Sequence, residues 1–436
     1  MKKIRVGVLG LGTVGQGVAK VLLQNAQEIT RRSGREIEIT HVCSGNQEMY
    51  SQLGLTCQLS TDPFAVVNDN DVDIIVELFG GEEPARELLL RAIKNGKPVV
   101  TANKALIAGF GNEIFAAAQQ HDVAVGYEAA VAGGIPIIKT IREGLVANRI
   151  EWLAGIINGT TNFILTEMEE KGAEFSAVLK QAQALGYAEA DPTFDVEGVD
   201  AAHKLTILAS IAFGIPLQFT HVQIEGITNI TPADIAYADE FGYRFKHLGI
   251  AKRTAQGIEL RVHPTLIPKK RLIANVKGVM NAIVVKGDAV GPTLHYGAGA
   301  GSLATASSVV ADIVDVARGL GSDSTRRVPY LAFQTKALSD LPIVPSTDVQ
   351  SAYYLRLRAK DESGVLAKIT KALADQDISI EAFLQKEPAT AGENVDIVLL
   401  TNVVAQQQVA NAVVELESLN SVTENVASFH LETFSD

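Results

Sequence analysis

The stretch IRVGVLGLGTVG, residues 4–15, predicts the fold of the amino-terminal part of the chain. Its first six residues are mostly apolar, as in a short buried strand, and residues 14–23 place apolar side chains at helical spacing. Between them lies a G-x-G-x-x-G turn. In this pattern Gly10 permits the tight turn, Gly12 lets backbone N–H groups approach a pyrophosphate, and Gly15 lets the helix pack on the strand. Because strand and helix flank it, the turn predicts a dinucleotide site rather than a merely structural glycine-rich turn.

Strands and helices alternate through the residues that follow this turn. A helix is predicted over 84–94, and further apolar strands are predicted at 37–42, 72–78, 98–101 and 123–127. This alternation predicts an α/β, Rossmann-like, doubly wound parallel sheet. Right-handed crossovers would bring the carboxyl ends of the strands, and the ligand, to one edge of that sheet.

The pattern of predicted strands and helices changes twice more along the chain. A helix over 137–146 and a strand over 150–157 open a long mixed region, which predicts a second, α+β domain. Prolines and polar residues between 328 and 350 mark a connector. The last residues follow the order βαββαβ of a ferredoxin-like unit. We therefore expect domains at 1–128, 129–320 and 351–436, with a linker at 321–350.

Composition limits the class of protein. The 436 residues are 47% hydrophobic and carry a formal charge of −12, which predicts a multidomain globular chain and disfavours nucleic acid as a partner. Glycines interrupt the apolar amino terminus, and no apolar run of about 18 residues exists, so we expect neither secretion nor a membrane span. Only Cys43 and Cys57 are present, which fits a reducing, cytoplasmic location.

A lysine follows one of the predicted strands directly. Thr101-Ala102-Asn103-Lys104 comes after the strand at 98–101 and so lies at the binding edge of the sheet. Lys104 could hold a negative group of a cofactor or substrate, or exchange a proton with it. Alternatively, Lys104 is a solvated loop lysine without a function. The position of Lys104 at the end of a strand favours the functional interpretation.

An acidic segment, GYAEADPTFDVEGVD at residues 186–200, is followed by Ala201-Ala202-His203-Lys204. So many carboxylates in a short loop repel one another unless some bind cations or polar substrate groups. Asp200 and Lys204 lie one turn apart on a helix predicted over 199–213, above an apolar stripe. Such a pair is ordinarily a surface pair that contributes about 0.2–0.5 kcal/mol. Its place after the acidic loop favours a catalytic role instead.

Three features leave alternatives open. Gly297-Ala298-Gly299-Ala300-Gly301 precedes a predicted small-residue helix at 302–318 and suits either a wall of the cofactor cleft or close helix packing. The second strand ends at Cys43 and Ser44, with neither the acidic residue that favours NAD nor the arginine that favours NADP. His121, His221 and His263 have no metal-ligand spacing.

Four motifs together resemble the homoserine dehydrogenase family: GLGTVG, TANK, NGTTNFIL at 158–165, and GYAEADPTFDVEGVDAAHK. The resemblance runs from residue 3 to about 318, and the terminal unit resembles an ACT domain. The family implies that the second domain, residues 129–320, serves catalysis and dimerisation. It implies a homo-oligomer that reversibly reduces L-aspartate 4-semialdehyde to L-homoserine with NAD(P)H. It also implies feedback regulation, which we expect from threonine through the ACT domain.

The same resemblance implies roles for individual residues. Lys204 corresponds to the proton donor, with Asp200 orienting it and with Asp200 and Glu189 contacting substrate. The segment 128–135 corresponds to a monovalent-cation site, usually sodium, formed by the Glu128 carboxylate and backbone carbonyls. Many relatives place an arginine at the end of strand two, where this chain has Cys43 and Ser44. The implied cofactor contacts are Gly10, Gly12, Thr13, Val14, Gly15, Lys104, Gly186 and Gly301, and the implied cation ligands are Glu128, Val131, Gly133 and Ile135.

Two other functions compete with this one. A dehydrogenase that works through a covalent thioester needs a nucleophilic cysteine with a base nearby, and both cysteines are far in sequence from the acidic segment. A non-catalytic amino-acid sensor would use residues 361–364, which precede a helix where a ligand carboxylate could bind but which equally suit an ordinary turn. The intact glycine turn, Asp200 and Lys204 favour the enzyme, with sensing as an added property.

Overall fold

The computed structural model describes residues 3–321, 327–386 and 394–434. It divides into two compact units, each made of several stretches of the chain. The first unit comprises Met1–Gly159, Asp200–Val222 and Val279–Leu341. The second comprises Thr160–Val199, Gln223–Gly278 and Pro342–Asp436.

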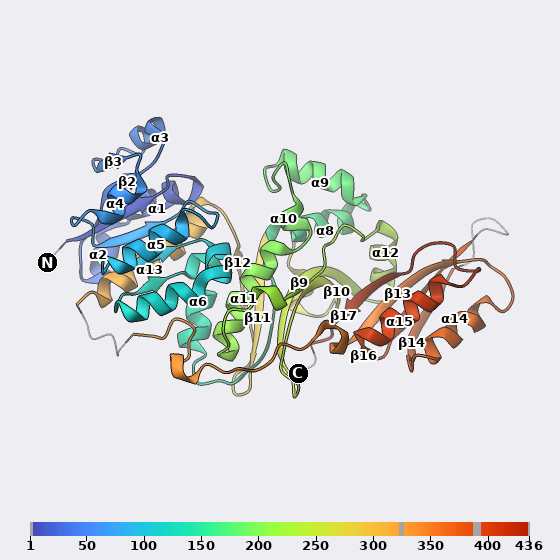
Figure 1. Cartoon of the computed structure of the whole chain (residues 1–436). Helices are drawn as coiled ribbons and strands as arrows, with labels where there is room; N and C mark the ends of the chain where they lie inside the picture. Colours follow the sequence, from blue (N-terminus) through green and yellow to red (C-terminus); the bar gives the residue numbers. More distant parts are fainter. Residues whose placement is uncertain (1–2, 322–326, 387–393, 435–436) are drawn as a thin grey trace. The chain divides into compact units, whose positions relative to one another are not determined.

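The first unit contains the predicted parallel sheet (Figure 1). Its strand order is β3-β2-β1-β4-β5-β6. Every neighbouring pair in it is parallel, which confirms the doubly wound fold. The strand order reverses between β1 and β4, so the glycine turn after β1 lies at the switch point where ligands of such sheets bind. The strands are β1 (Ile4–Leu9), β2 (Ile37–Cys43), β3 (Gln58–Ser60), β4 (Ile74–Glu77), β5 (Val99–Thr101) and β6 (Val125–Gly126).

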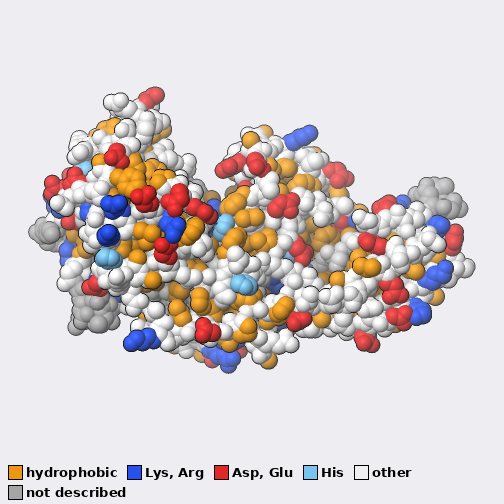
Figure 2. Space-filling view, viewed as in Figure 1, with side chains coloured by type: hydrophobic (Ala, Val, Ile, Leu, Met, Phe, Trp, Pro, Cys, Tyr) orange, Lys and Arg blue, Asp and Glu red, His pale blue; other side chains and the backbone are white. Residues whose placement is uncertain are grey.

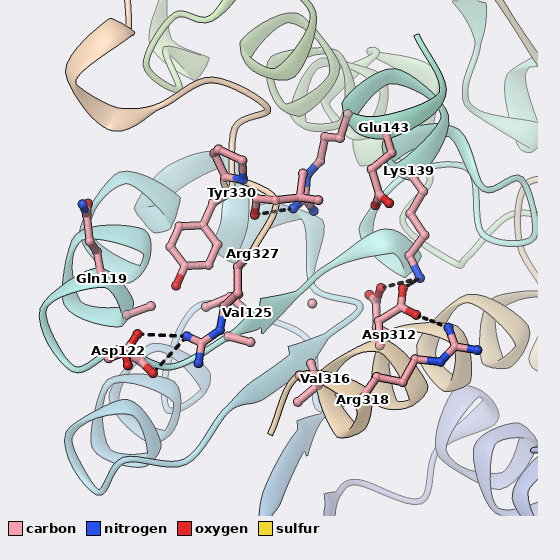
Figure 3. A pocket seen from close by; sticks show the side chains of 18 of the residues that line it. Gln119, Asp122, Val125, Lys139, Glu143, Asp312, Val316, Arg318, Arg327 and Tyr330 are labelled. Atoms are coloured by element: carbon pink, nitrogen blue, oxygen red, sulfur yellow. Dashed lines mark hydrogen bonds and ion pairs between the residues drawn. The ribbon is translucent and has the colours of Figure 1, made fainter. Parts of the chain in front are cut away.

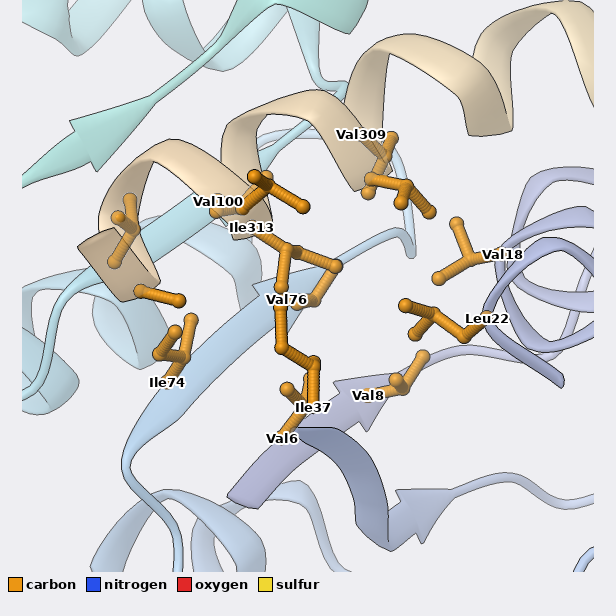
Figure 4. Close-up of a cluster of buried hydrophobic side chains, with 14 of the residues drawn as sticks. Val6, Val8, Val18, Leu22, Ile37, Ile74, Val76, Val100, Val309 and Ile313 are labelled. Atoms are coloured by element: carbon orange, nitrogen blue, oxygen red, sulfur yellow. The ribbon is translucent and has the colours of Figure 1, made fainter. Parts of the chain in front are cut away.

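Helices cover both faces of this sheet. On one face Val6 and Val8 of β1 pack with α1, α2 and α13, and Figure 4 shows Val309 and Ile313 of α13 within this core. On the other face α4 packs against Gly7, where a Cβ would come within 2.8 Å of Val66. Alternate residues of one strand thus serve two cores. The helices are α1 (Thr13–Gln24), α2 (Ala26–Ser33), α3 (Gln47–Gln52), α4 (Pro63–Asn68), α5 (Ala85–Lys94), α6 (Lys104–Gln120) and α13 (Ser302–Gly319).

The rest of the first unit includes an antiparallel sheet of β7 (Ile150–Ile156), β11 (Met280–Gly287) and β12 (Gly291–Ala298). The helix predicted over 199–213 is α11 (Val199–Phe213). The helix predicted over 137–146 is only partly correct. It forms as α7 (Ile137–Lys139) and widens into a π-helical turn, Thr140–Gly144, because the Leu145 N–H bonds the Thr140 carbonyl five residues back.

The second unit contains a sheet with strand order β9-β10-β17-β13-β15-β14. Its last four strands and two helices follow the predicted order βαββαβ. The final helix begins at Gln406, because residues 404–405 pair with β13 and the Gln408 side chain accepts the Ala405 N–H. The elements are α8 (Gly159–Lys171), α9 (Phe175–Ala184), α10 (Thr193–Val196), β8 (Gln223–Ile224), α12 (Pro232–Glu240), β9 (Tyr243–Arg253), β10 (Ile258–Pro268), β13 (Gln350–Ala359), α14 (Val365–Ala374), β14 (Ile380–Gln385), β15 (Val395–Thr401), β16 (Val404–Ala405), α15 (Gln406–Glu417) and β17 (Ala427–Leu431).

The surface agrees with the acidic composition. On the face drawn in Figure 2, Lys and Arg side chains are interspersed with Asp and Glu and form no extended basic area over the described residues. None of the helices in the described part of the chain has the length and apolar character needed to cross a bilayer.

Candidate active site

The three glycines of the turn differ in their surroundings. Gly10 has a φ of +104°, a backbone conformation that favours glycine, and its N–H donates to the Cys43 carbonyl at 2.9 Å. A Cβ at Gly15 would overlap the carbonyl oxygen of Gly10, so the helix packs tightly on the turn there. A Cβ at Gly12 would meet nothing within 4 Å. Only Gly12 therefore faces open space, at the N-terminus of α1 where an anion is favoured.

A second helix begins beside this turn. The Ser302 hydroxyl at the start of α13 donates to the Thr13 carbonyl at 2.6 Å, and a Cβ at Gly17 would overlap the Ser302 backbone. Gly301, just before α13, has a φ of +113° and open space around it. The N-termini of α1 and α13 therefore lie together in the first unit, although they are almost 300 residues apart in sequence.

The structure separates the two interpretations of the segment 297–301. Gly299 is a packing position, because a Cβ there would overlap the Asn281 side chain. Gly297 is also close-packed, since a Cβ there would come within 3.0 Å of the Ile135 side chain. Gly301 is neither, since it is open and lies beside the glycine turn. Packing thus accounts for the first two glycines and leaves Gly301 as the cleft candidate.

Matched alanine substitutions test these different surroundings. Gly12→Ala is expected to weaken coenzyme binding about 10-fold or more with an unchanged Tm, because the methyl enters the space where a pyrophosphate approaches the backbone. Gly15→Ala is expected to lower the free energy of unfolding by about 1–3 kcal/mol through overpacking. Coenzyme titration by fluorescence and thermal melts measure both. A wild-type coenzyme Kd in Gly12→Ala would contradict the assignment.

Asp200 is held between two lysines. Its Oδ1 lies 2.8 Å from Lys104 Nζ, and its Oδ2 lies 2.6 Å from Lys204 Nζ. Oδ2 also accepts a hydrogen bond from Asn158 Nδ2 at 2.8 Å. Burial alone would raise the pKa of Asp200, but the two ammonium groups outweigh it and hold that pKa well below its ordinary value. Asp200 is therefore ionised throughout the neutral range.

Two hydrogen-bond acceptors orient the ammonium group of Lys204. Its ammonium donates to Asp200 and, at 2.8 Å, to the carbonyl of Ile157, which follows β7. The side chains of Lys204 and Asp200 are only 12% and 3% exposed, so the interpretation as an ordinary surface pair is wrong. With Lys104 the three side chains carry a net charge of +1. This excess positive charge suits an oxygen that becomes negative during a reaction.

Asn158 and His203 also lie at this site, and neither was predicted from the sequence as a site residue. Asn158 lay within a quoted motif, and its place directly after a strand was the available signal. The His203 ring stacks on Phe219 at 4.2 Å, and burial lowers its pKa to about 4. His203 is thus neutral at pH 7, which leaves the lysines as the proton-carrying cations of the cluster.

Two other predicted site residues belong to the second unit. Gly186 follows α9 with a φ of +74°, and Glu189 lies exposed on the segment between α9 and α10. The Thr160 hydroxyl donates to the Tyr187 carbonyl at 2.7 Å, and the Tyr187 ring contacts Phe163. The acidic segment is therefore anchored to α8 through Tyr187, while Glu189 stays accessible.

Glu128 lies in a buried turn after β6. It is 2% exposed, and its two carboxylate oxygens accept the N–H groups of Ile138 and Lys139 at 2.9 Å each. Burial, followed by the nearby Asp312 carboxylate, raises the pKa of Glu128 to about 7. Ala132 and Gly133 both have left-handed φ angles, of 54° and 45°. A buried alanine in that conformation is strained, and such strain is common at functional sites.

The segment 128–135 offers the oxygen ligands that a hard cation prefers. The candidate donors are all oxygens: the Glu128 carboxylate and the carbonyls of Val131, Gly133 and Ile135. The Gly133 carbonyl accepts the Ser308 hydroxyl and the Ile135 carbonyl accepts the Ile137 N–H, but each carbonyl has a second lone pair. No cluster of three or more His, Cys, Asp or Glu side chains suited to a metal occurs in the described part of the chain. A site here would depend on carbonyls.

The first unit also contains a separate cavity of about 560 Å³ (Figure 3). It is lined by residues of α6, β6, the α7 turn and α13, and its charges are largely paired, as in Arg327 with Asp122 and Lys139 with Asp312. Neither the glycine turn nor the lysines at Asp200 line this cavity. It is therefore not the candidate active site.

Comparison with known proteins agrees over the whole chain. Family models match residues 10–128 (homoserine dehydrogenase, NAD binding domain), 136–314 (homoserine dehydrogenase) and 353–420 (ACT domain). The chain is 59% identical to a homoserine dehydrogenase of Pseudomonas aeruginosa and 53% identical to one of Neisseria gonorrhoeae, over at least 99% of each chain. A crystal structure of a homoserine dehydrogenase from Thiobacillus denitrificans is 61% identical, with a TM-score of 0.95 over 100% of this chain and 99% of that one.

Proposed function

Because the chain belongs to the homoserine dehydrogenase family and is an oxidoreductase, we propose that it reversibly reduces L-aspartate 4-semialdehyde to L-homoserine with NAD(P)H. The observation that carries this reaction is the buried Asp200 between Lys104 and Lys204, in the same unit as the glycine turn. The purified chain is expected to oxidise NADPH with the semialdehyde and to reduce NADP⁺ with homoserine. No turnover in either direction would contradict the proposal.

The lysines perform the acid–base chemistry of this reaction. A reduced nicotinamide, when bound, would supply the hydride for the aldehyde carbon. Lys204 then donates a proton to the oxygen that becomes an alkoxide, and the net charge of +1 stabilises that oxygen as it forms. Asp200 and the Ile157 carbonyl hold the Lys204 ammonium in one orientation. Lys104 acts near the cofactor and the carbonyl, and Asp200 and Glu189 contact the substrate, with Glu189 receiving its ammonium or hydroxyl group.

We propose NADP as the coenzyme, with NAD also accepted. The cofactor contacts are Gly10, Gly12, Thr13, Val14, Gly15, Lys104, Gly186 and Gly301. Cys43 and Ser44 end β2 without a carboxylate that would repel a 2′-phosphate. Initial rates with NADPH and NADH, measured in parallel on the semialdehyde, test this choice. Rates with NADPH are expected to equal or exceed those with NADH, and activity with NADH alone would contradict it.

We propose that a monovalent cation, sodium, binds Glu128 and the carbonyls of Val131, Gly133 and Ile135. It would neutralise the buried carboxylate and hold the strained turn before α7. The Tm is expected to be several degrees higher in NaCl than in choline chloride at equal ionic strength, because a ligand of the folded state stabilises it. Glu128→Gln should abolish that difference. Equal melting temperatures of the wild type in both salts would contradict the proposal.

We propose that L-threonine inhibits the enzyme through the ACT domain. Residues 361–364 precede α14, whose N-cap is Gly364 with a φ of +87°. Gly364→Ala is expected to weaken inhibition by threonine, because the strained backbone moves the N–H groups that a ligand carboxylate would meet. Gly34→Ala, at a φ of +70° in open space in the first unit, is the matched control. Unchanged inhibition in Gly364→Ala would contradict this site.

Finally, we propose that the protein forms a homo-oligomer and is located in the cytoplasm. We also propose that its domains have the limits predicted from the sequence. β12 is an edge strand with the exposed apolar side chains Leu294 and Tyr296. Exposed edges of this kind readily pair with another chain. Light scattering coupled to size-exclusion chromatography measures the assembly, and a monomer at assay concentration would contradict it.

A further inference from the structure

Glu77 is a buried carboxylate that the proposed reaction does not use. It is the last residue of β4, at the carboxyl edge of the parallel sheet, and it is fully buried. No Lys, Arg or His lies within ion-pair distance of it among the residues that the structure describes. A charged group buried without a counter-ion is costly, so its presence at this edge requires an explanation.

One oxygen of Glu77 organises the loop beside the glycine turn. Its Oε1 accepts the N–H groups of Phe79 and Gly80 at 2.8 and 3.3 Å. This loop contacts the turn directly, because a Cβ at Gly10 would come within 3.1 Å of the Leu78 carbonyl and 3.3 Å of the Phe79 ring. The carboxylate thus shapes the wall against which the dinucleotide turn is built.

The other oxygen of Glu77 organises the segment that carries Lys104. Its Oε2 accepts the Thr101 hydroxyl at 2.6 Å, and the Thr101 oxygen accepts the Asn103 N–H at 2.9 Å. Asn103 in turn caps α6 by accepting the Leu106 N–H at 3.1 Å, and its amide donates to the Gly81 carbonyl. Lys104, the first residue of α6, reaches Asp200 from this cap.

We propose that Glu77 is a positioning residue of the reaction. The two oxygens of its buried carboxylate hold the loop 78–81 and the segment that carries Lys104 in fixed positions relative to each other. The inference rests on the role proposed above for Lys104. Thr101 is the side chain through which Glu77 acts on Lys104, and the backbone of Phe79 and Gly80 is the route by which it acts on the coenzyme wall. Burial raises the pKa of Glu77 above its ordinary value, and the hydrogen bonds from Thr101, Phe79, Gly80 and Asn103 offset only part of that rise. These donors, rather than a counter-ion, hold the carboxyl group in place.

The test uses Glu77→Gln in the full-length chain, with Asp73→Asn as a matched control. Asp73 bonds Arg5 at the opposite, amino end of β4, so its loss disturbs the same strand away from the site. In Glu77→Gln the new amide must donate toward Thr101, and the Thr101 hydroxyl loses its acceptor. We expect kcat to fall roughly 100-fold, as for a small misplacement of a catalytic group. Thr101→Val should give a similar loss of kcat with an unchanged coenzyme Kd. Thr101→Ser keeps the hydroxyl and should therefore have the kcat of the wild type.

A double-mutant cycle distinguishes positioning from general damage. In a Lys104→Ala background and at saturating coenzyme, Glu77→Gln is expected to lower kcat less than threefold further, because the ammonium through which it affects kcat is gone and its effect on the coenzyme wall changes only the coenzyme Kd. Multiplied losses in the double variant, wild-type kcat in Glu77→Gln, or an equal loss in Asp73→Asn would each overturn the inference. A wild-type kcat in Lys104→Ala would instead refute the proposed role of Lys104. The Thr101 variants keep the test decisive if Glu77→Gln fails to fold.

Discussion

Lys204→Ala is expected to lower kcat about 10²–10⁴-fold, the usual contribution of a positioned general acid. The substitution removes the ammonium that donates to Asp200 at 2.6 Å and to the Ile157 carbonyl at 2.8 Å. It also removes the net positive charge at the place where the alkoxide forms. Asp200 keeps its pair with Lys104, so the fold should survive. Oxidation of NADPH with the semialdehyde, together with a thermal melt, measures both effects.

Two further variants identify the cause of that loss. Lys204→Arg keeps the positive charge but gives up a proton far less readily, so it should recover electrostatic stabilisation without recovering proton donation. Lys97→Met removes another buried lysine, one that donates to the Asp69 carbonyl at the other edge of the same sheet, and should leave kcat unchanged. If Lys204→Ala retained kcat within threefold of the wild type, Lys204 would not be the proton donor.

Local patterns in the sequence were sufficient for the elements and for part of the site. The glycine turn, its strand and its helix are contiguous, so spacing alone predicted them. Asp200 and Lys204 could be paired because they lie one turn apart on one helix. Lys104 could be placed at the sheet edge, but not against Asp200, because nothing in a single sequence encodes a contact over 96 residues. Asn158 was missed for the same reason.

Packing partners were the part that the sequence did not reveal. The composition of residues 302–318 predicted a small-residue helix, but not that it packs on the parallel sheet formed about 200 residues earlier. Hydrophobic periodicity shows which face is buried and leaves open what covers it. Likewise, Glu128 lay in an apparent glycine-rich turn. Only its burial among backbone N–H donors shows that a carboxylate is enclosed there.

The same limit affects the carboxy-terminal unit. Prolines at 329, 342 and 345 predicted a connector to an appended domain. In the structure, β17 pairs in parallel with β10, through Thr265 with His430 and Leu266 with Leu431. The terminal strands therefore continue the sheet of the second compact unit. Removing them would do more than remove a regulatory domain.

Truncation after Pro345 is expected to prevent stable folding of the second unit. It would strip Tyr354 and Phe429 from a core that they share with Phe245, whose ring lies 5.1 Å from that of Phe429. It would also remove Glu432 from Arg261 and Arg356 from Asp234, and both Arg261 and Asp234 are completely buried. Removing one partner of a buried ion pair costs about 3–5 kcal/mol, and whole domains are stable by only about 5–15 kcal/mol.

Circular dichroism, thermal melts and gel filtration of residues 1–345 against the full chain measure this loss. Arg356→Met is the graded comparison, because it leaves every strand in place and removes only the ion pair of Asp234, which keeps its hydrogen bonds from Thr231 and Tyr354. It should lower the Tm while the chain still folds. Truncation is therefore a poor test of threonine regulation, since an unfolded enzyme has no response to lose. A soluble 1–345 chain that melted cooperatively within a few degrees of the full protein would contradict this prediction, because the terminal strands would then be dispensable for folding. Truncation would in that case test threonine inhibition more directly than Gly364→Ala.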